Sequence, residues 1–390
     1  MDNQIIRRSL RLLKIEAIIT SVVFAMPILN IFYAEEIGLS LAEVGLTQAA
    51  FTIAVFLFNI PTGWLADRFS RKACNVFGDL LAAGGFVFYA FAQSFTDIVI
   101  AEIVVGIGLA FTGGADVALL KAYASKLGES YQKLNAQLAS WRPITEMAAV
   151  SLGGIVGAYS PRLAIALSAV TYGTGAVLSL FIVEAGEHRK SGVHPVKDMA
   201  RITRFALHGH EQLAWRIAAY ALGREATHPI IWILTPLLLL AGIPPAAIGV
   251  SWAINLALVW VGAQLARRYG GALSASRVLA IGVAVFAVSS AVLMVDVNLV
   301  TIVFYAGFGF VRGWYGAQLL PAVQHHTPAD IQSTVVSVAA SAAQLIYIPL
   351  VWGVGVLGDI SPQASIAGVF CLFVPLLALT AHKIARFEAR

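Results

Sequence analysis

Long apolar stretches recur along the whole chain and constrain its fold more than any other feature. Each is about 20 residues long, the length that an α-helix needs to cross the ~30 Å hydrocarbon core of a bilayer. Of the 390 residues, 59% are hydrophobic and only 12% are charged, whereas soluble domains have about 25% charged residues. We therefore predict an all-α membrane protein with twelve transmembrane helices. The predicted spans are 15–34, 43–66, 73–93, 96–118, 142–160, 162–183, 214–240, 246–266, 275–295, 298–320, 334–357 and 362–382.

The positive charges lie on one side of the predicted membrane. The net charge is +5, but all of the 26 Lys and Arg residues except Arg162, Arg224 and Arg312 fall in or beside segments on the side that holds both termini. Cytoplasmic segments carry such an excess of cations. We therefore expect a multi-pass protein of the plasma (inner) membrane with both termini in the cytoplasm, and no nucleic-acid partner. The N-terminus does not have the pattern of a cleavable signal peptide.

One polar segment divides the chain. Residues 184–213 hold five cations and no long apolar run, and they separate an N-terminal six-helix bundle, 1–183, from a C-terminal six-helix bundle, 214–390. Two readings of this cytoplasmic central loop stay open: a solvated linker, or an amphipathic helix on the membrane surface. Short matches between the halves recur in order at offsets of about 200 residues, which indicates an internal repeat.

The loop between the second and third predicted spans carries a specific pattern. From Gly63 to Lys72, one aspartate, Asp67, stands between a glycine and the cations Arg68, Arg71 and Lys72. A glycine allows two helices to approach closely, an aspartate is favoured at a helix N-terminus, and cations hold a loop at the anionic inner leaflet. The alternative is an ordinary cation-rich cytoplasmic loop.

This segment resembles motif A of the major facilitator superfamily, with Ser70 where glycine is usual. Together with the helix count, the central loop and the repeat, the resemblance covers essentially the whole chain, and it favours the branch of drug:proton antiporters. It implies the major facilitator fold, with parallel six-helix repeats, and a conformational latch at the cytoplasmic face. Against export, the fifth span lacks the Gly-Pro pair of the antiporter motif. The predicted latch residues are Gly63, Asp67, Arg68, Arg71 and Asp116.

Ionisable residues inside the predicted spans are the main functional candidates, because each costs at least ~2.5–3.5 kcal/mol at the bilayer centre. The resemblance implies that helices 1, 4, 7 and 10 line a central cavity, and the deepest charges fall on the last three. The two arginines favour an anionic, zwitterionic or amphiphilic solute. His228 as a neutral packing residue, Trp314 as packing and Asn30 as an interhelical hydrogen-bonding residue are the alternatives. The predicted substrate-binding residues are Arg224, His228, Arg312, Trp314 and Asn30.

Two buried carboxylates are candidates for proton coupling. A carboxylate that is buried and has a cationic neighbour can change its protonation state during a transport cycle. Glu225 is adjacent to Arg224, and Glu102 lies in the fourth span. Two alternatives stay open: Glu225 could form a static ion pair, and Glu102 could reach external water. The family often has a buried arginine near the position of Glu102, so the family's coupling arrangement does not transfer.

These features predict a secondary active transporter of a small organic solute that works by alternating access, is coupled to protons and favours export. ATP drive is not supported, because the sequence has no P-loop. A lipid or amphiphile flippase of the same fold and proton-coupled uptake of an anionic metabolite are the alternatives. A membrane-embedded enzyme is disfavoured, because the paired carboxylates or exposed His-Asp pair of such enzymes are not found. We expect a monomer whose partners are a small-molecule substrate, protons and membrane lipids, with no cofactor and no metal.

Overall fold

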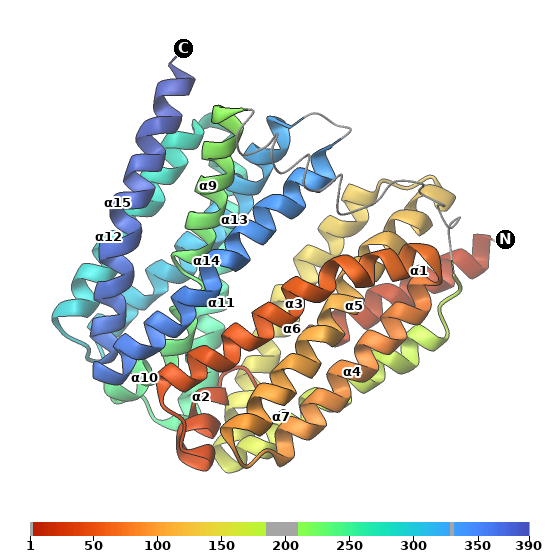
Figure 1. Ribbon diagram of the computed structural model, residues 1–390, viewed down its shortest axis with the longest axis horizontal. Coiled ribbons are helices and arrows are strands. Elements are labelled where there is room, and N and C mark those ends of the chain that lie inside the picture. The colour runs from red at the N-terminus through yellow and green to blue at the C-terminus, as the bar shows by residue number, and fades with distance from the viewer. Residues whose placement is uncertain (1–2, 185–209, 328–330, 390) are drawn as a thin grey trace. The chain divides into compact units, whose positions relative to one another are not determined.

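The computed structural model describes residues 3–184, 210–327 and 331–389. Among these residues all regular elements are helical. Contacts divide the chain into two compact units, one built mainly from the first six predicted spans and the other mainly from the last six. In Figure 1 they run from red to yellow-green and from green to blue. Most of the predicted central loop, residues 185–209, lies outside the described residues, and so does its predicted surface helix.

The helices of the first unit follow the predicted spans closely, except at the first span. In Figure 1, α4, α5 and α7 of this unit pack side by side. The elements are α1 (Asn3–Ile19), α2 (Leu29–Ile31), the π-helix η1 (Phe32–Ile37), α3 (Leu41–Arg68), α4 (Arg71–Phe91), α5 (Phe95–Leu127), α6 (Tyr131–Tyr159) and α7 (Pro161–Leu180).

The second unit repeats this order of helices. In it α12 packs against α13 and α15, and α9 packs against α13, α14 and α15. The elements are α9 (Glu211–Glu225), α10 (Ile231–Leu240), α11 (Pro245–Tyr269), the 3₁₀-helix η3 (Gly270–Ala272), α12 (Ala275–Val295), the 3₁₀-helix η4 (Thr301–Tyr305), α13 (Ala306–His325), α14 (Gln332–Ile360) and α15 (Pro362–Glu388).

Eight of the described helices are long and apolar enough to cross a membrane: α3, α4, α5, α7, α11, α12, α14 and α15. The remaining predicted spans correspond to α6 and to three segments that are interrupted or change helix type: α1 to η1, α9 to α10, and η4 to α13. The interruptions are the main departure from the predicted fold, and they occur in the first helix of both halves.

The predicted continuous helix over 15–34 is wrong, because the chain leaves the helical conformation between α1 and α2. Irregular backbone at membrane depth needs protein partners, since hydrocarbon offers none. Two side chains of α7 provide them. The hydroxyl of Ser168 accepts a hydrogen bond from the Ala25 N–H (3.1 Å), and the hydroxyl of Thr171 donates to the Val22 carbonyl (3.0 Å).

The predicted continuous helix over 214–240 is also wrong, because the chain turns between α9 and α10. Pro229 lies in this turn and has no N–H to donate. The Tyr305 hydroxyl donates to the Ile230 carbonyl at 3.1 Å. Pro27 lies in the first interruption, about 200 residues earlier. Interrupted helices at corresponding positions of two halves are the feature that points most directly to a transporter's binding site.

Two glycines determine how closely α4 and α5 approach. A Cβ atom at Gly78 would lie 2.6 Å from the Gly108 carbonyl oxygen, and one at Gly108 would lie 2.7 Å from the Gly78 carbonyl oxygen. Close helix crossings of this kind need residues without a side chain. Gly63 was expected to have this role, but a Cβ atom there meets no atom within 4 Å in the part of the chain that the structure describes. A Cβ atom at Gly114 of α5 would, however, lie 3.8 Å from the Gly63 Cα, so the role expected for Gly63 stays a prediction.

Candidate functional site

Three ionisable side chains meet where α9 ends. Glu225, the last residue of α9, has a side chain that is 0% exposed, and its Oε1 lies 3.2 Å from Nε of Arg224. Its Oε2 lies 3.3 Å from Nδ1 of His228. Oε1 accepts no hydrogen bond from the described residues, so the contact with Arg224 is an ion pair only. The side chain of Arg224 is 39% exposed, which leaves the cation open to a ligand.

Aromatic rings and the second predicted arginine surround this group. The His228 ring stacks on the Tyr347 ring with centroids 4.5 Å apart and an interplanar angle of 29°. The Tyr347 hydroxyl accepts a hydrogen bond of 2.9 Å from Nε1 of the buried Trp232. Arg312 of α13 lies near enough for its charge to act on His228 and on Tyr305. The structure therefore brings Arg224, Glu225, His228 and Arg312 together within the second unit.

Two other predicted binding residues have different surroundings. The indole of Trp314 donates a hydrogen bond of 2.9 Å to the Val278 carbonyl on α12 and stacks on Phe310, so it contributes to packing. Asn30 is buried on α2, directly after the interruption of the first helix. A substrate contact stays a prediction for both.

Glu102 lies in a closed polar group inside the first unit. Its Oε1 accepts hydrogen bonds from Nε2 of Gln48 (2.5 Å) and from the hydroxyls of Tyr33 and Tyr89 (3.1 Å each). The two tyrosine hydroxyls also contact each other. Only 6% of Glu102 is exposed. The carboxylate is thus buried among neutral donors, rather than in contact with external water.

Sequence patterns did not predict the tyrosines in these two groups. Tyr33 lies in η1, Tyr89 in α4 and Tyr347 in α14, and no spacing in the sequence links them to Glu102 or His228. The sequence holds only a weak signal for these contacts. A tyrosine hydroxyl inside an apolar helix usually has a hydrogen-bond partner, so each of these residues indicated a polar contact without identifying it.

The motif residues end α3 and begin α4. The guanidinium of Arg68 lies 5.0 Å from the centre of the Trp64 ring, a cation–π contact. Ser70 caps α4 through its hydroxyl, which accepts a hydrogen bond of 3.0 Å from the Ala73 N–H. Serine is among the preferred N-cap residues, so there is a local reason for serine at this position. The side chain of Asp67 lies outside the described residues, and its role in a latch stays a prediction.

Glu184 closes the N-terminus of α4, a contact that the sequence did not predict. Its carboxylate accepts hydrogen bonds from the Ser70 hydroxyl (2.6 Å) and from the backbone N–H groups of Arg71 (3.2 Å) and Lys72 (3.0 Å). An acidic group is favoured at a helix N-terminus, where unpaired N–H groups and the helix dipole both attract it. The segment that follows the sixth helix of the first half is thereby bound to the start of the third helix.

The second half has the same arrangement. Ser274 caps α12, and Glu388 at the end of α15 accepts a hydrogen bond of 2.8 Å from the Ala275 N–H and one of 2.5 Å from the Ser276 hydroxyl. Both the cap and the carboxylate recur at an offset of 204 residues, as the sequence numbering gives directly. The internal repeat thus extends to the contact between the third and sixth helices.

Asp116 is half-buried in α5 and faces Asn75 of α4 and Arg142 of α6. The predicted partner was Arg71, whose backbone is bound by Glu184 as described above. A pairing of Asp116 with Arg71 stays a prediction. The neighbours that the structure does give place Asp116 in a different group of buried acids within the first unit.

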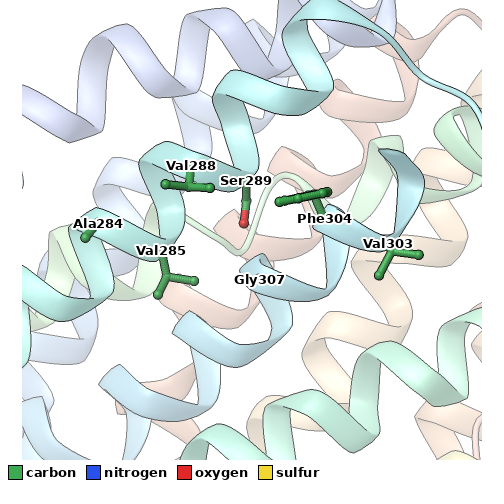
Figure 2. A pocket seen from close by; sticks show the side chains of 7 residues that line it. All are labelled: Ala284, Val285, Val288, Ser289, Val303, Phe304 and Gly307. Carbon is green, nitrogen blue, oxygen red and sulfur yellow. The ribbon is translucent and has the colours of Figure 1, made fainter. Parts of the chain in front are cut away.

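Two apolar pockets lie in the second unit. Figure 2 shows one of about 480 Å³ between α12 and the start of α13, and another of about 730 Å³ lies between α14 and α15. No charged side chain is among the described residues that line them, so neither coincides with the predicted site. The first is lined by Ala284, Val285, Val288, Ser289, Val303, Phe304 and Gly307.

A helical membrane protein with two similar halves, interrupted first helices and buried charges at one interruption has the architecture of a transporter. The chain belongs to the Major Facilitator Superfamily, because the model of that family matches residues 17–350. The predicted major facilitator fold is therefore confirmed, and the protein is a secondary transporter rather than an enzyme.

Solved structures give the same fold. A mutant of the nucleoside transporter NupG is 13% identical with a TM-score of 0.81, and the similarity covers 97% of this chain and 99% of that one. A bacterial homologue of the human lysosomal transporter Spinster, inward-facing and unoccupied, is 14% identical (TM-score 0.73, 99% and 96% covered). The POT family transporter PepTSo is also 14% identical, with a TM-score of 0.73, and the similarity covers 100% of this chain and 98% of that one. No curated protein sequence gives a significant match.

Proposed function

We propose that this protein is a proton-coupled secondary transporter that binds the anionic group of a small organic solute at the interrupted helix of its second unit. The observation that carries the proposal is the group of Arg224, Glu225 and His228 around the end of α9. Discontinuous helices form the substrate and ion sites of many secondary transporters, and ionisable residues within the membrane are functional candidates by default.

The charge of this group favours an anion. One buried carboxylate, Glu225, is shared between Arg224 and His228, and the charge of Arg312 acts on the same histidine. A carboxylate or phosphate on the substrate can take two hydrogen bonds from a guanidinium. The stacked rings of His228 and Tyr347 supply apolar surface beside the cations. An amphiphilic or aromatic acid would use both features.

Coupling follows from competition for Arg224. When Glu225 is ionised it holds the guanidinium, and when it is protonated the guanidinium is free to bind the substrate anion. Proton and substrate then favour each other's binding, as linkage requires. Glu102 is the second candidate. Its protonation would change the hydrogen bonds to Tyr33 and Tyr89, which meet at the same oxygen.

Several further properties belong to this proposal. Alternating access would be controlled by a latch at the loop between α3 and α4, and the protein would act as a monomer in the plasma membrane with both termini in the cytoplasm. Export, by the branch of drug:proton antiporters, is the direction that the resemblance favours. Proton-coupled uptake of an anionic metabolite uses the same site and is the direction that joint binding of proton and substrate favours, whereas antiport would need the two to exclude each other.

A screen of thermal stability tests the proposed substrate class. The probes are benzoate, a dipeptide, a nucleoside and a lysophospholipid. The dipeptide and the nucleoside are chosen because a peptide transporter and a nucleoside transporter are among the solved structures with this fold. We expect the carboxylate-bearing probes to raise the melting temperature of the wild type and of Arg277→Ala, an exposed control on α12, but not that of Arg224→Ala.

Hits are then tested in proteoliposomes with an imposed pH gradient, whose direction separates export from uptake. Two outcomes would contradict the proposal: stabilisation by the neutral nucleoside alone, or anion binding that is unaffected in Arg224→Ala. Stabilisation by the lysophospholipid alone would support a flippase instead.

A further inference from the structure

A second group of buried acids lies in the first unit and shares no residue with the Glu102 group. Glu16 of α1 and Asp79 of α4 are each 1% exposed. Their carboxyl groups lie within hydrogen-bonding reach of each other. An ionised carboxylate only accepts hydrogen bonds. A contact between two carboxyl groups therefore needs a proton on one of them.

The surrounding charges lead to the same requirement. Asp116 adds a third carboxylate, whose charge acts on both Glu16 and Asp79. Arg142 supplies the positive charge that acts on Glu16 and Asp116. Among the described groups that act on this cluster, three acids thus face one cation. Carboxylates that share a site cannot all ionise together, and a buried charge without a counter-charge is costly.

An amide beside the acids provides an independent indication. Asn75 is 0% exposed and faces Asp116. Its Nδ2 donates a hydrogen bond to the Ser179 hydroxyl (3.2 Å), while its Oδ1 has no donor among the described residues. Glu16 Oε2 and Asp79 Oδ2 also have none. Buried acceptors in folded proteins almost always have a donor, so the group is short of hydrogens rather than of acceptors.

We propose that Glu16 and Asp79 bind one exchangeable proton between them, at a site separate from Glu102 and Glu225. The site lies one helical turn before the first helix is interrupted, and loss of the proton would make α1 and α4 repel each other there. The inference goes beyond the proposed function, because a proton can reside at this pair whatever the protein transports. The charged and titratable groups that face the pair are Asp116, Arg142 and Tyr172, and Glu146 acts on the same tyrosine.

Infrared spectroscopy of the purified full-length protein tests the proposal without a substrate. At neutral pH we expect a carbonyl stretch from a protonated carboxyl group that shifts in D2O and disappears reversibly as the pH is raised. The double variant Glu16→Gln with Asp79→Asn should lose the intensity of one protonated carboxyl group. Glu102→Gln should keep that component, which separates this pair from the Glu102 group, and the exposed control Glu35→Gln should match the wild type.

Each single substitution imitates a protonated acid, so both single variants should fold and elute from size-exclusion chromatography as the wild type does. Three outcomes would overturn the proposal: a wild type without the band, a double variant that keeps its full intensity, or failure of both single variants to fold. None of these outcomes depends on whether the proposed transport activity is correct.

Discussion

Glu225 and Glu102 are both buried carboxylates, but the structure holds them in different ways. Glu225 lies 3.2 Å from a guanidinium nitrogen and 3.3 Å from an imidazole nitrogen, so its partners are groups that a substrate anion can also bind. Glu102 is held by an amide and two hydroxyls, which an anion has no reason to displace. We therefore propose that Glu225 competes with the substrate anion for Arg224. Protonation of Glu102 would change only the hydrogen bonds around it.

Glu102→Gln tests the second assignment. Glutamine can still accept the tyrosine hydrogen bonds, so the variant should fold and bind substrate, but it cannot carry a proton. We expect transport driven by a pH gradient to fall at least tenfold, about 1.4 kcal/mol in barrier height, in proteoliposomes. Glu35→Gln, at an exposed position, serves as the control. Wild-type transport by Glu102→Gln would exclude Glu102 from coupling.

The ionisable members of the candidate site could be predicted from the sequence, while their tyrosine partners could not. Arg224, Glu225 and His228 are conspicuous because charges inside apolar spans are costly, and their closeness in the chain keeps them together even though the helix ends at Glu225. Tyr89 and Tyr347 reach Glu102 and His228 from other helices. Only the packing of the helices determines those contacts.

The interruptions of the first helix in each half show the limit of prediction for whole elements. Pro27 and Pro229 were visible in the sequence, but Pro61 and Pro143 lie inside α3 and α6 without ending them, as membrane helices tolerate. The interrupted segments differ in having neighbours, such as Ser168, whose side chains form hydrogen bonds with backbone groups that the interruption leaves unpaired. The starts of helices are easier to predict from a sequence than their interruptions, because serine followed by proline marks the N-termini of α7 and α15.

The serine caps of the third helices should stabilise both halves. Ser70→Ala removes the cap of α4 and a donor to Glu184, and Ser274→Ala removes the corresponding cap of α12. An N-cap substitution of this kind costs about 1 kcal/mol. We expect both variants to melt at a lower temperature than Ser125→Ala, an exposed control. Melting temperatures equal to that of the control would show that the caps do not stabilise the protein.

Asp67→Asn tests the latch expected in the loop between α3 and α4. Asparagine keeps the size of the side chain but removes its charge, so the protein should insert and express normally while transport falls strongly. The measurement is substrate flux per molecule of inserted protein. Normal flux at normal expression would mean that the segment is an ordinary cytoplasmic loop.

At the scale of the whole molecule, the repeat explains most of the architecture. Both halves have an interrupted first helix, a serine cap on the third helix and a carboxylate at or just after the end of the sixth, at offsets of about 200 residues. The sequence predicted two similar six-helix bundles from short glycine-containing matches and from the polar segment 184–213. It did not predict Glu16, Asp79 and Asp116 as one group, because they come from three different helices.

The predicted topology is tested at the segment between the halves. Nearly all cations fall on one side of the predicted membrane, so residues 184–213 should be cytoplasmic. A cysteine introduced as Ser191→Cys, in a protein without Cys74 and Cys371, should resist membrane-impermeant thiol reagents in intact cells and react after lysis. Reaction in intact cells would show that this segment lies outside and that the predicted topology is wrong.

We propose that a proton on Glu225 and an anionic solute on Arg224 favour each other's binding. The most direct measurement is the affinity for the carboxylate found in the stability screen, as a function of pH, for wild type and Glu225→Gln. Glu211→Gln, at an exposed position on the same helix, is the control. We predict that the affinity of the wild type and the control rises as the pH falls, and that Glu225→Gln keeps the high affinity of low pH throughout. If Glu225→Gln instead retains the wild-type pH profile, Glu225 is not the coupling group.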